Sequence, residues 1–149
     1  MTGVIPAWTL TDALHAPLVE DKCDLLFVYG ILKRGFELDL RGKAKFVDTA
    51  QLDGAILYRV GSGVGLRIVE DASRTVYGEV FKIPQGLWRW LDMIESNGFA
   101  YTRRIVEVCL GNPEGPNSGW VKAWVYEHSY PNFRYDNPIL NGIYTHDAV

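Results

Sequence analysis

Cysteine is scarce in this chain, with only Cys23 and Cys109 among 149 residues. The two form no CxxC pair and are too few for a disulfide-dense scaffold, so we expect reduced, structural thiols. No apolar run approaches the roughly 20 residues that a bilayer-spanning helix needs. Residues 1–22 also lack the basic start and apolar block of a signal peptide. The sequence therefore predicts a cytoplasmic protein with no membrane partner.

Concentrated charge and metal-ligand clusters are also missing. The net charge is -3 and the basic residues are scattered along the chain, which argues against a nucleic-acid partner. The three histidines, His15, His128 and His146, are too dispersed to indicate a metal set. The segment 61–65 is rich in glycine but lacks the GK[ST] of a phosphate-binding loop, so we expect a tight turn between strands there. No serine stands in a GxSxG context. We expect no metal and no cofactor.

The chain has ample material for one hydrophobic core. Apolar residues make up 48% of a sequence whose length suits a single domain. Residues 1–22 are mixed in character and contain two prolines, which indicates an N-terminal arm. We expect the domain itself to occupy residues 23–149.

Several segments show strand patterns, and one shows helical spacing. The apolar run 25–29 ends at a glycine and is typical of a strand buried on both faces. A helix is expected after Pro84, which suits a first helical turn, with an apolar stripe formed by Leu87, Leu91 and Ile94. Further strands are predicted at 46–60, 66–69, 75–83, 101–110 and 120–128, the last two as a long-looped hairpin, and 130–149 is expected to be irregular. This pattern predicts an α+β fold in one domain, a small mixed or antiparallel β-barrel flanked by one or two helices.

Glu95 is the most informative residue because of its angle on the expected helix. At about 100° per residue it lies about 40° from Leu91, beside the apolar stripe. A carboxyl there loses water, which raises its pKa and suits it to general acid–base catalysis. The alternative is that Glu95 ends the helix, frays to solvent or pairs with Arg103 or Arg104. The angle by itself does not choose between these interpretations.

Two neighbouring features have both functional and ordinary explanations. The turn of residues 29–32 follows a buried strand, and the freedom of Gly30 lets successive backbone N–H groups converge on a carboxylate or oxyanion. A strand that simply ends at a glycine is the ordinary explanation, and by itself the more common one. Asp92 lies about 60° from Glu95 on the helix. It is either a second carboxylate at the site or a solvated residue, and we favour the solvated interpretation.

Four short segments, in order, resemble one family. Residues 27–35 read FVYGILKRG and look like a YG[ST]L signature continued by LKxG. Residues 54–58 read GAILY, residues 91–95 read LDMIE with Tyr101 and Arg103 following, and residues 123–126 read AWVY. These segments are similar to those of the gamma-glutamylcyclotransferase-like family, most closely its gamma-glutamylamine cyclotransferase branch. The resemblance runs from about residue 25 to about residue 128.

The resemblance implies an activity and a set of residue roles. Such enzymes release 5-oxoproline and a free amine or amino acid from a gamma-glutamyl compound by intramolecular aminolysis, without a metal. By this resemblance Glu95 transfers protons. Backbone N–H groups of Gly30, Ile31 and Leu32 hold the substrate. The resemblance also implies that Tyr29, Tyr101 and Tyr126 line the pocket and offer O–H contacts.

This chain departs from the family pattern at two positions. Ile31 replaces a small hydroxyl residue, which removes one O–H, and Ser96 replaces the glycine that follows the glutamate. A non-catalytic small-molecule-binding or regulatory module of the same fold is therefore the rival hypothesis. Hydrolysis of, or transfer from, another small amide is a third. The sequence does not specify the leaving amine or the oligomeric state.

Overall fold

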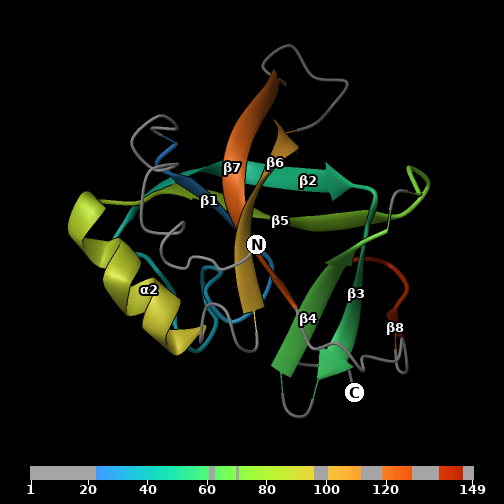
Figure 1. Ribbon diagram of the computed structural model, residues 1–149, viewed down its shortest axis with the longest axis horizontal. Helices are drawn as coiled ribbons and strands as arrows, with labels where there is room; N and C mark the ends of the chain where they lie inside the picture. Colours follow the sequence, from blue (N-terminus) through green and yellow to red (C-terminus); the bar gives the residue numbers. More distant parts are fainter. Residues whose placement is uncertain are drawn as a thin grey trace.

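The computed structural model describes residues 23–60, 63–69, 71–95, 101–111, 119–128 and 138–145. Within these residues five strands close into a barrel in the order β1-β5-β2-β6-β7, and three more form a separate sheet in the order β4-β3-β8 (Figure 1). The elements are β1 (Leu25–Val28), β2 (Lys45–Asp53), β3 (Ala55–Val60), β4 (Gly63–Ile68), β5 (Thr75–Lys82), the 3-10 turn η1 (Gln85–Leu87), α2 (Trp88–Ile94), β6 (Tyr101–Leu110), β7 (Gly119–His128) and β8 (Pro138–Ile139).

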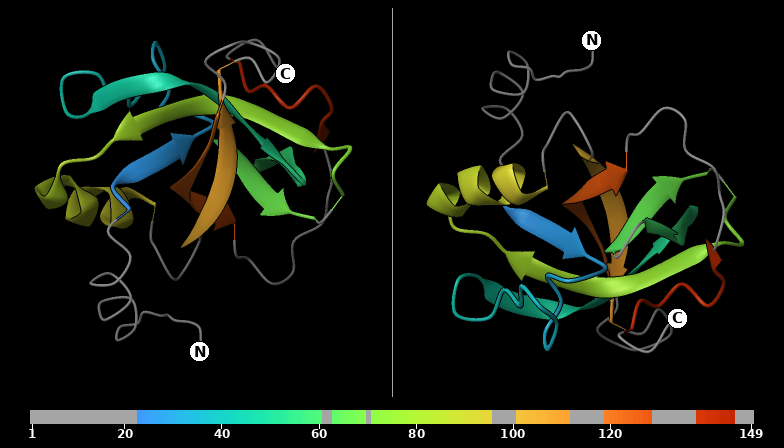
Figure 2. Two further views of the ribbon diagram at one scale, coloured as in Figure 1. Left: turned by 90° about the horizontal axis from the view of Figure 1, so that it is seen from above. Right: turned by 90° about the horizontal axis from the view of Figure 1, so that it is seen from below.

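The predicted α+β fold with a small mixed barrel is confirmed. Strands β6 and β7 form the expected antiparallel hairpin, from Tyr101 opposite His128 to Leu110 opposite Gly119. The barrel closes where β1 runs antiparallel to β5 and parallel to β7, with Leu26 opposite Trp124. This one parallel contact makes the barrel mixed. Helix α2 packs on one side of the hairpin and the β4-β3-β8 sheet lies on the other side (Figures 1 and 2).

The expectation of one strand region across residues 46–60 is wrong, because two strands, β2 and β3, occupy it. Gly54 has a φ of 81°, a conformation that glycine adopts without steric cost, and its N–H donates to the Arg74 carbonyl at 2.7 Å. The chain therefore bends between β2 and β3. As a result β2 belongs to the barrel whereas β3 starts the second sheet.

Strand β1 is buried as its apolar run predicted. Phe27 packs in the core cluster inside the barrel, whereas Leu26 packs in a second cluster with Leu91 of α2. The exposed fraction of both β1 side chains is 1% or less. Two apolar faces thus fix the strand whose C-terminal end leads into the turn of residues 29–32.

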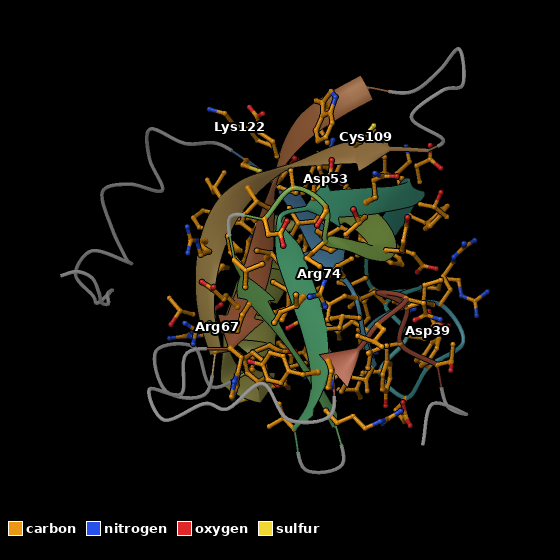
Figure 3. The ribbon with its side chains drawn as sticks, turned by 90° about the vertical axis from the view of Figure 1, so that its right-hand side faces the viewer. Asp39, Asp53, Arg67, Arg74, Cys109 and Lys122 are labelled. Atoms are coloured by element: carbon orange, nitrogen blue, oxygen red, sulfur yellow. The ribbon has the colours of Figure 1, made fainter. Side chains whose placement is uncertain are left out.

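The remaining sequence predictions have mixed outcomes. The helix after Pro84 begins as the 3-10 turn η1, and β4 starts at Gly63, inside the segment expected to be a turn. Within the stretch expected to be irregular, β8 pairs with β3. Cys23 and Cys109 form no disulfide with each other, and Cys109 lies opposite Gln51, where β6 meets β2 (Figure 3). The expected arm of residues 1–22 lies outside the described residues.

Across the described ranges, no helix combines the length and the apolar character needed to cross a membrane.

Candidate active site

A cavity of about 160 Å³ lies where five segments of the fold meet. Its wall comes from the end of α2, from β1 with the turn that follows it, and from β4, β6 and β7. All seven residues predicted for the site line this one cavity. Its lining consists of Phe27, Val28, Tyr29, Gly30, Ile31, Leu32, Val64, Ile94, Glu95, Tyr101 and Tyr126.

The sequence left open whether Glu95 lies at the apolar stripe or ends the helix, and the structure shows both. It does end α2, where its N–H donates to the Leu91 carbonyl at 3.0 Å, but its side chain is only partly exposed and lines the cavity. Burial, and secondarily the negative charge of Asp92, raises the pKa of Glu95 to about 7. The arginines proposed as partners bind elsewhere, Arg103 to Asp92 and Arg104 to Glu127. A carboxyl that titrates near neutrality can both accept and return a proton.

The turn after β1 packs closely against β4. A Cβ atom on Gly30 would lie 2.6 Å from Val64 Cγ1, and real Cβ atoms essentially never come that close. The φ of Gly30 is not in the left-handed region, so the glycine is needed for space rather than for an unusual dihedral. The turn's hydrogen bonds use the carbonyls of Gly30, Ile31 and Leu32 as acceptors. Among the described residues, none accepts from the N–H groups of these three residues.

The three tyrosines surround the cavity, but their hydroxyl protons are already used within the protein. The Tyr29 hydroxyl donates to the Tyr126 carbonyl at 2.6 Å, and the Tyr101 hydroxyl donates to the Val64 carbonyl at 2.9 Å. The Tyr126 hydroxyl donates to Asp92 Oδ1 at 2.6 Å. The expectation that these groups offer O–H donors to a substrate therefore needs correction. Their rings shape the cavity, and their oxygens can accept.

The expectation that Asp92 is a solvated helix residue is wrong. Besides accepting from Tyr126, its carboxylate forms an ion pair with Arg103 at 3.1 Å. Burial raises the pKa of Asp92, while Arg103 and the Tyr126 hydroxyl act in the opposite direction. The angular estimate placed Asp92 near Glu95, but the two partners come from β6 and β7, which the helix pattern does not reveal.

Other cavity residues, Val64 and Ile94 among them, were not predicted as site residues from the sequence. Val64 was assigned to a glycine-rich turn, whereas it lies in β4 and contacts the turn after β1. Ile94 was assigned only to the apolar stripe of the helix, although it also lines the cavity. The sequence could have indicated Ile94 as a cavity residue, because it belongs to the predicted helix and directly precedes Glu95. No local signal identified Val64.

A larger cavity of about 340 Å³ contains none of the predicted site residues. Lys33 and Glu79 are among its lining residues, and both already bind protein groups. The Lys33 ammonium donates to the Tyr144 carbonyl at 3.0 Å, and Glu79 accepts from Arg34. The smaller cavity is therefore the better candidate, because it alone combines the neutral-range carboxyl with the turn.

Metal ligands do not cluster in the part of the chain that the structure describes. His128 is buried in β7, with its Nδ1 hydrogen-bonded to the Tyr58 hydroxyl at 2.6 Å. His15, His146 and Ser96 lie outside the described residues. The histidine that can be placed therefore has a structural partner.

Similar proteins place this geometry in a family. Solved structures similar to this chain include an uncharacterised protein from Pyrococcus horikoshii, at 26% identity and a TM-score of 0.56, covering 80% of this chain and 87% of that one. An AIG2-like protein from Mus musculus matches at 23% identity and a TM-score of 0.64, covering 82% and 88%. A protein named gamma-glutamyl cyclotransferase matches at 19% identity and a TM-score of 0.52, covering 76% and 69%.

Among curated protein sequences, none matches the chain significantly. The family model described as "Gamma-glutamyl cyclotransferase, AIG2-like" matches residues 26–145, which include every residue that lines the candidate cavity. The match covers most of the chain and agrees with the folds of the solved structures. The chain therefore belongs to the gamma-glutamyl cyclotransferase, AIG2-like family.

Proposed function

We propose that the protein is a cyclotransferase that releases 5-oxoproline and a free amine or amino acid from a gamma-glutamyl compound. The observation that carries this proposal is the presence of Glu95, with its pKa of about 7, in the same cavity as the turn of residues 30–32. The reaction needs one group that exchanges protons near neutral pH and donors that hold an anionic or polarised oxygen. The cavity offers both. The family match and the solved structure named gamma-glutamyl cyclotransferase support the same substrate class.

The proposed reaction is an intramolecular aminolysis. The substrate's α-ammonium gives a proton to Glu95, and the resulting amine attacks the γ-carbonyl carbon. A five-membered ring forms as the bond between that carbon and the leaving nitrogen breaks. Overall, two protons leave the α-nitrogen and two reach the leaving nitrogen, so the Glu95 carboxylate can carry them in turn and is regenerated. The attacking and attacked groups share one molecule, and holding the folded-back conformer lowers much of the barrier.

The backbone N–H groups of Gly30, Ile31 and Leu32 take the second role in this proposal. They hold the substrate carboxylate or polarise the γ-carbonyl, and the rings of Tyr29, Tyr101 and Tyr126 shape the pocket around the folded substrate. The side chain of Ile31 offers no hydrogen bond, so the contact made at this position is the backbone N–H. The leaving nitrogen receives its proton from Glu95 rather than from a tyrosine, since all three hydroxyl protons are engaged.

Product analysis tests this proposal against its rivals. The protein is incubated with gamma-glutamyl amines, gamma-glutamyl amino acids and glutathione, and the products are identified by mass spectrometry. The proposed function requires 5-oxoproline together with the free amine. Release of glutamate instead would indicate hydrolysis. Ligand binding without any product would favour the non-catalytic module, which the Ile31 departure motivates.

We expect kcat/KM to decline as the pH falls below about 7. Glu95 must be ionised to take the first proton, and its pKa of about 7 means that the reactive fraction falls tenfold for each pH unit below that value. We expect kcat/KM to follow this decline between pH 7 and pH 5. Initial rates of 5-oxoproline formation over pH 5–8, with the fold monitored by circular dichroism, provide the measurement. A limb near the ordinary glutamate pKa would contradict the assigned role.

Chelation should leave turnover unchanged. The proposed steps need only proton transfer and positioning, and the described residues hold no cluster of metal ligands. Rates measured after dialysis against EDTA should equal those of a sample dialysed against buffer alone. Loss of activity with EDTA and its return with zinc or manganese would instead point to a metal-assisted reaction.

A further inference from the structure

Arg103, near the start of β6, is held between two tryptophan rings. Its guanidinium carbon lies 4.6 Å from the ring centroid of Trp88 and 4.6 Å from that of Trp124. The two rings meet edge to face at 6.4 Å, and the Arg103 side chain is only 7% exposed. A planar cation confined in this way has little rotational freedom, and the ring faces attract it. Arg103 is therefore a rigid anchor between α2, which carries Trp88, and β7, which carries Trp124.

Asp92 is held by this anchor on one side and by Tyr126 on the other. Its Oδ2 accepts from Arg103 Nη2 at 3.1 Å, and its Oδ1 accepts from the Tyr126 hydroxyl at 2.6 Å. Each carboxylate oxygen thus has its own partner, one from β6 and one from β7. Hydrogen bonds to an ionised carboxylate are among the stronger hydrogen bonds in proteins. The position of the carboxylate is consequently fixed by two strands that are independent of the helix.

The two partners of Asp92 link it to the candidate cavity. Tyr126 lines that cavity, and its carbonyl accepts from Tyr29, another lining residue. Asp92 also lies three residues before Glu95, a spacing that brings side chains on a helix close together. The titratable and charged groups that act on Glu95 or on the three cavity tyrosines come from several elements: Asp92 from α2, Tyr29 after β1, Tyr58 from β3, Tyr101 and Arg103 from β6, and Tyr126 and Glu127 from β7. Asp92 is the group among them whose charge acts on Glu95 itself.

We propose, building on the proposed cyclotransferase function, that Asp92 is the positioning residue of the site: anchored by Arg103, it orients Tyr126 against the substrate and places a negative charge beside Glu95. It does not itself touch the reacting atoms. Its hydrogen bond keeps the Tyr126 ring in the cavity wall, and its charge makes Glu95 hold its proton more tightly. The burial of Glu95 and this charge act in the same direction on its pKa. One ion pair thereby adjusts both the shape and the proton affinity of the site.

Replacing Asp92 by Asn separates its charge from its hydrogen bond. The Asn amide oxygen can still accept from Tyr126, whereas the Asn NH2 cannot accept from Arg103 and the side chain carries no charge. The titration of Glu95 should therefore move to lower pH by about 0.5 unit or more. Carbon-13 NMR of labelled glutamate carboxyls follows this titration directly, with Glu95→Gln identifying the resonance. Glu107→Gln is the matched control, because it removes an exposed carboxylate from the opposite part of β6 and should leave the titration unmoved. An unchanged Glu95 titration in a folded Asp92→Asn protein would overturn the proposal.

A double-mutant cycle tests the link between Asp92 and Tyr126. Tyr126→Phe keeps the ring but removes its bond to Asp92, and we expect kcat to fall about 10-fold. If Asp92 acts through Tyr126, then Asp92→Ala, which removes the acceptor of the Tyr126 hydroxyl, should reduce kcat in the Tyr126→Phe background by clearly less than it does in the wild type. Fully additive losses would contradict that link. The NMR titration does not depend on turnover, so a protein that forms no 5-oxoproline would refute the proposed function and still leave the effect of Asp92 on Glu95 measurable.

Discussion

Glu95→Gln should reduce 5-oxoproline formation by about 100- to 10,000-fold, the usual contribution of a general acid–base residue. Glutamine has nearly the shape of glutamate and still forms hydrogen bonds, but it cannot carry a proton between the two nitrogens. The loss should therefore appear in kcat, with KM little changed. Steady-state kinetics on the substrate that the product screen identifies provide the measurement. A folded variant that turns over at nearly the wild-type rate would refute the central assignment.

Glu95→Asp tests the geometry of the same group. The shorter side chain keeps the charge but withdraws it by one methylene from the reacting amine, so we expect a severe loss here as well. Glu107→Gln again serves as the control for removal of a carboxylate, and its activity should match the wild type. Comparable losses in all three variants would indicate a general effect of charge rather than a role for Glu95.

The stability of Glu95→Gln should move in the opposite direction from its activity. The folded-state pKa of Glu95 is raised from 4.5 to about 7, so its protonated form favours folding and its ionisation opposes folding. In the wild type, Glu95 therefore does not lower the free energy of unfolding below about pH 4.5, and it lowers it by the full amount above about pH 7. Glutamine removes that penalty, and we expect the variant to be more stable by about 1–3 kcal/mol at pH 8 and nearly equal at pH 4.5. Urea denaturation at the two pH values measures the difference.

Gly78→Ala should destabilise the fold by about 3 kcal/mol, because its new methyl group has no space. A Cβ atom at Gly78 in β5 would lie 2.2 Å from the Val28 carbonyl oxygen and 2.9 Å from Phe27 Cζ. Both contacts are in β1, and one is with backbone that cannot rotate away. Either β1 moves outward or its pairing with β5 breaks. We expect the melting temperature to fall by about 10 °C.

Gly86→Ala is the matched control for this prediction. Gly86 lies in η1, where an added Cβ meets nothing within 4 Å, so alanine should be neutral or slightly stabilising. Activity gives a second measurement, because β1 leads directly into the turn of residues 29–32. The remaining folded Gly78→Ala protein should bind substrate more weakly. Equal melting temperatures for the two variants would show that β1 adapts without cost.

The family, the fold class and several strands of this protein are determined by its sequence alone. The run of residues 25–29 is apolar at every position, and such a run can be buried on both faces. Strand β1 was therefore predictable from this local pattern. The hairpin of β6 and β7 was predictable because a Gly/Pro/Asn segment separates two runs of aromatic and branched residues. Glu95 was a candidate because helical periodicity, which is local, brought its carboxylate to the apolar stripe. Local sequence patterns suffice to predict a strand or a helix face when the interactions that produce it are between residues close in sequence.

Only the tertiary structure decided which of those candidates meet. The bend at Gly54 depends on a hydrogen bond to Arg74, 20 residues away in sequence, and it sends β3 and β4 into a second sheet. That sheet brings Val64 to Gly30, which closes the cavity. Asp92 looked like a solvated residue because its partners, Arg103 and Tyr126, come from strands that follow the helix in sequence. Contacts between distant segments depend on how the elements pack, and no periodicity within one element contains that information.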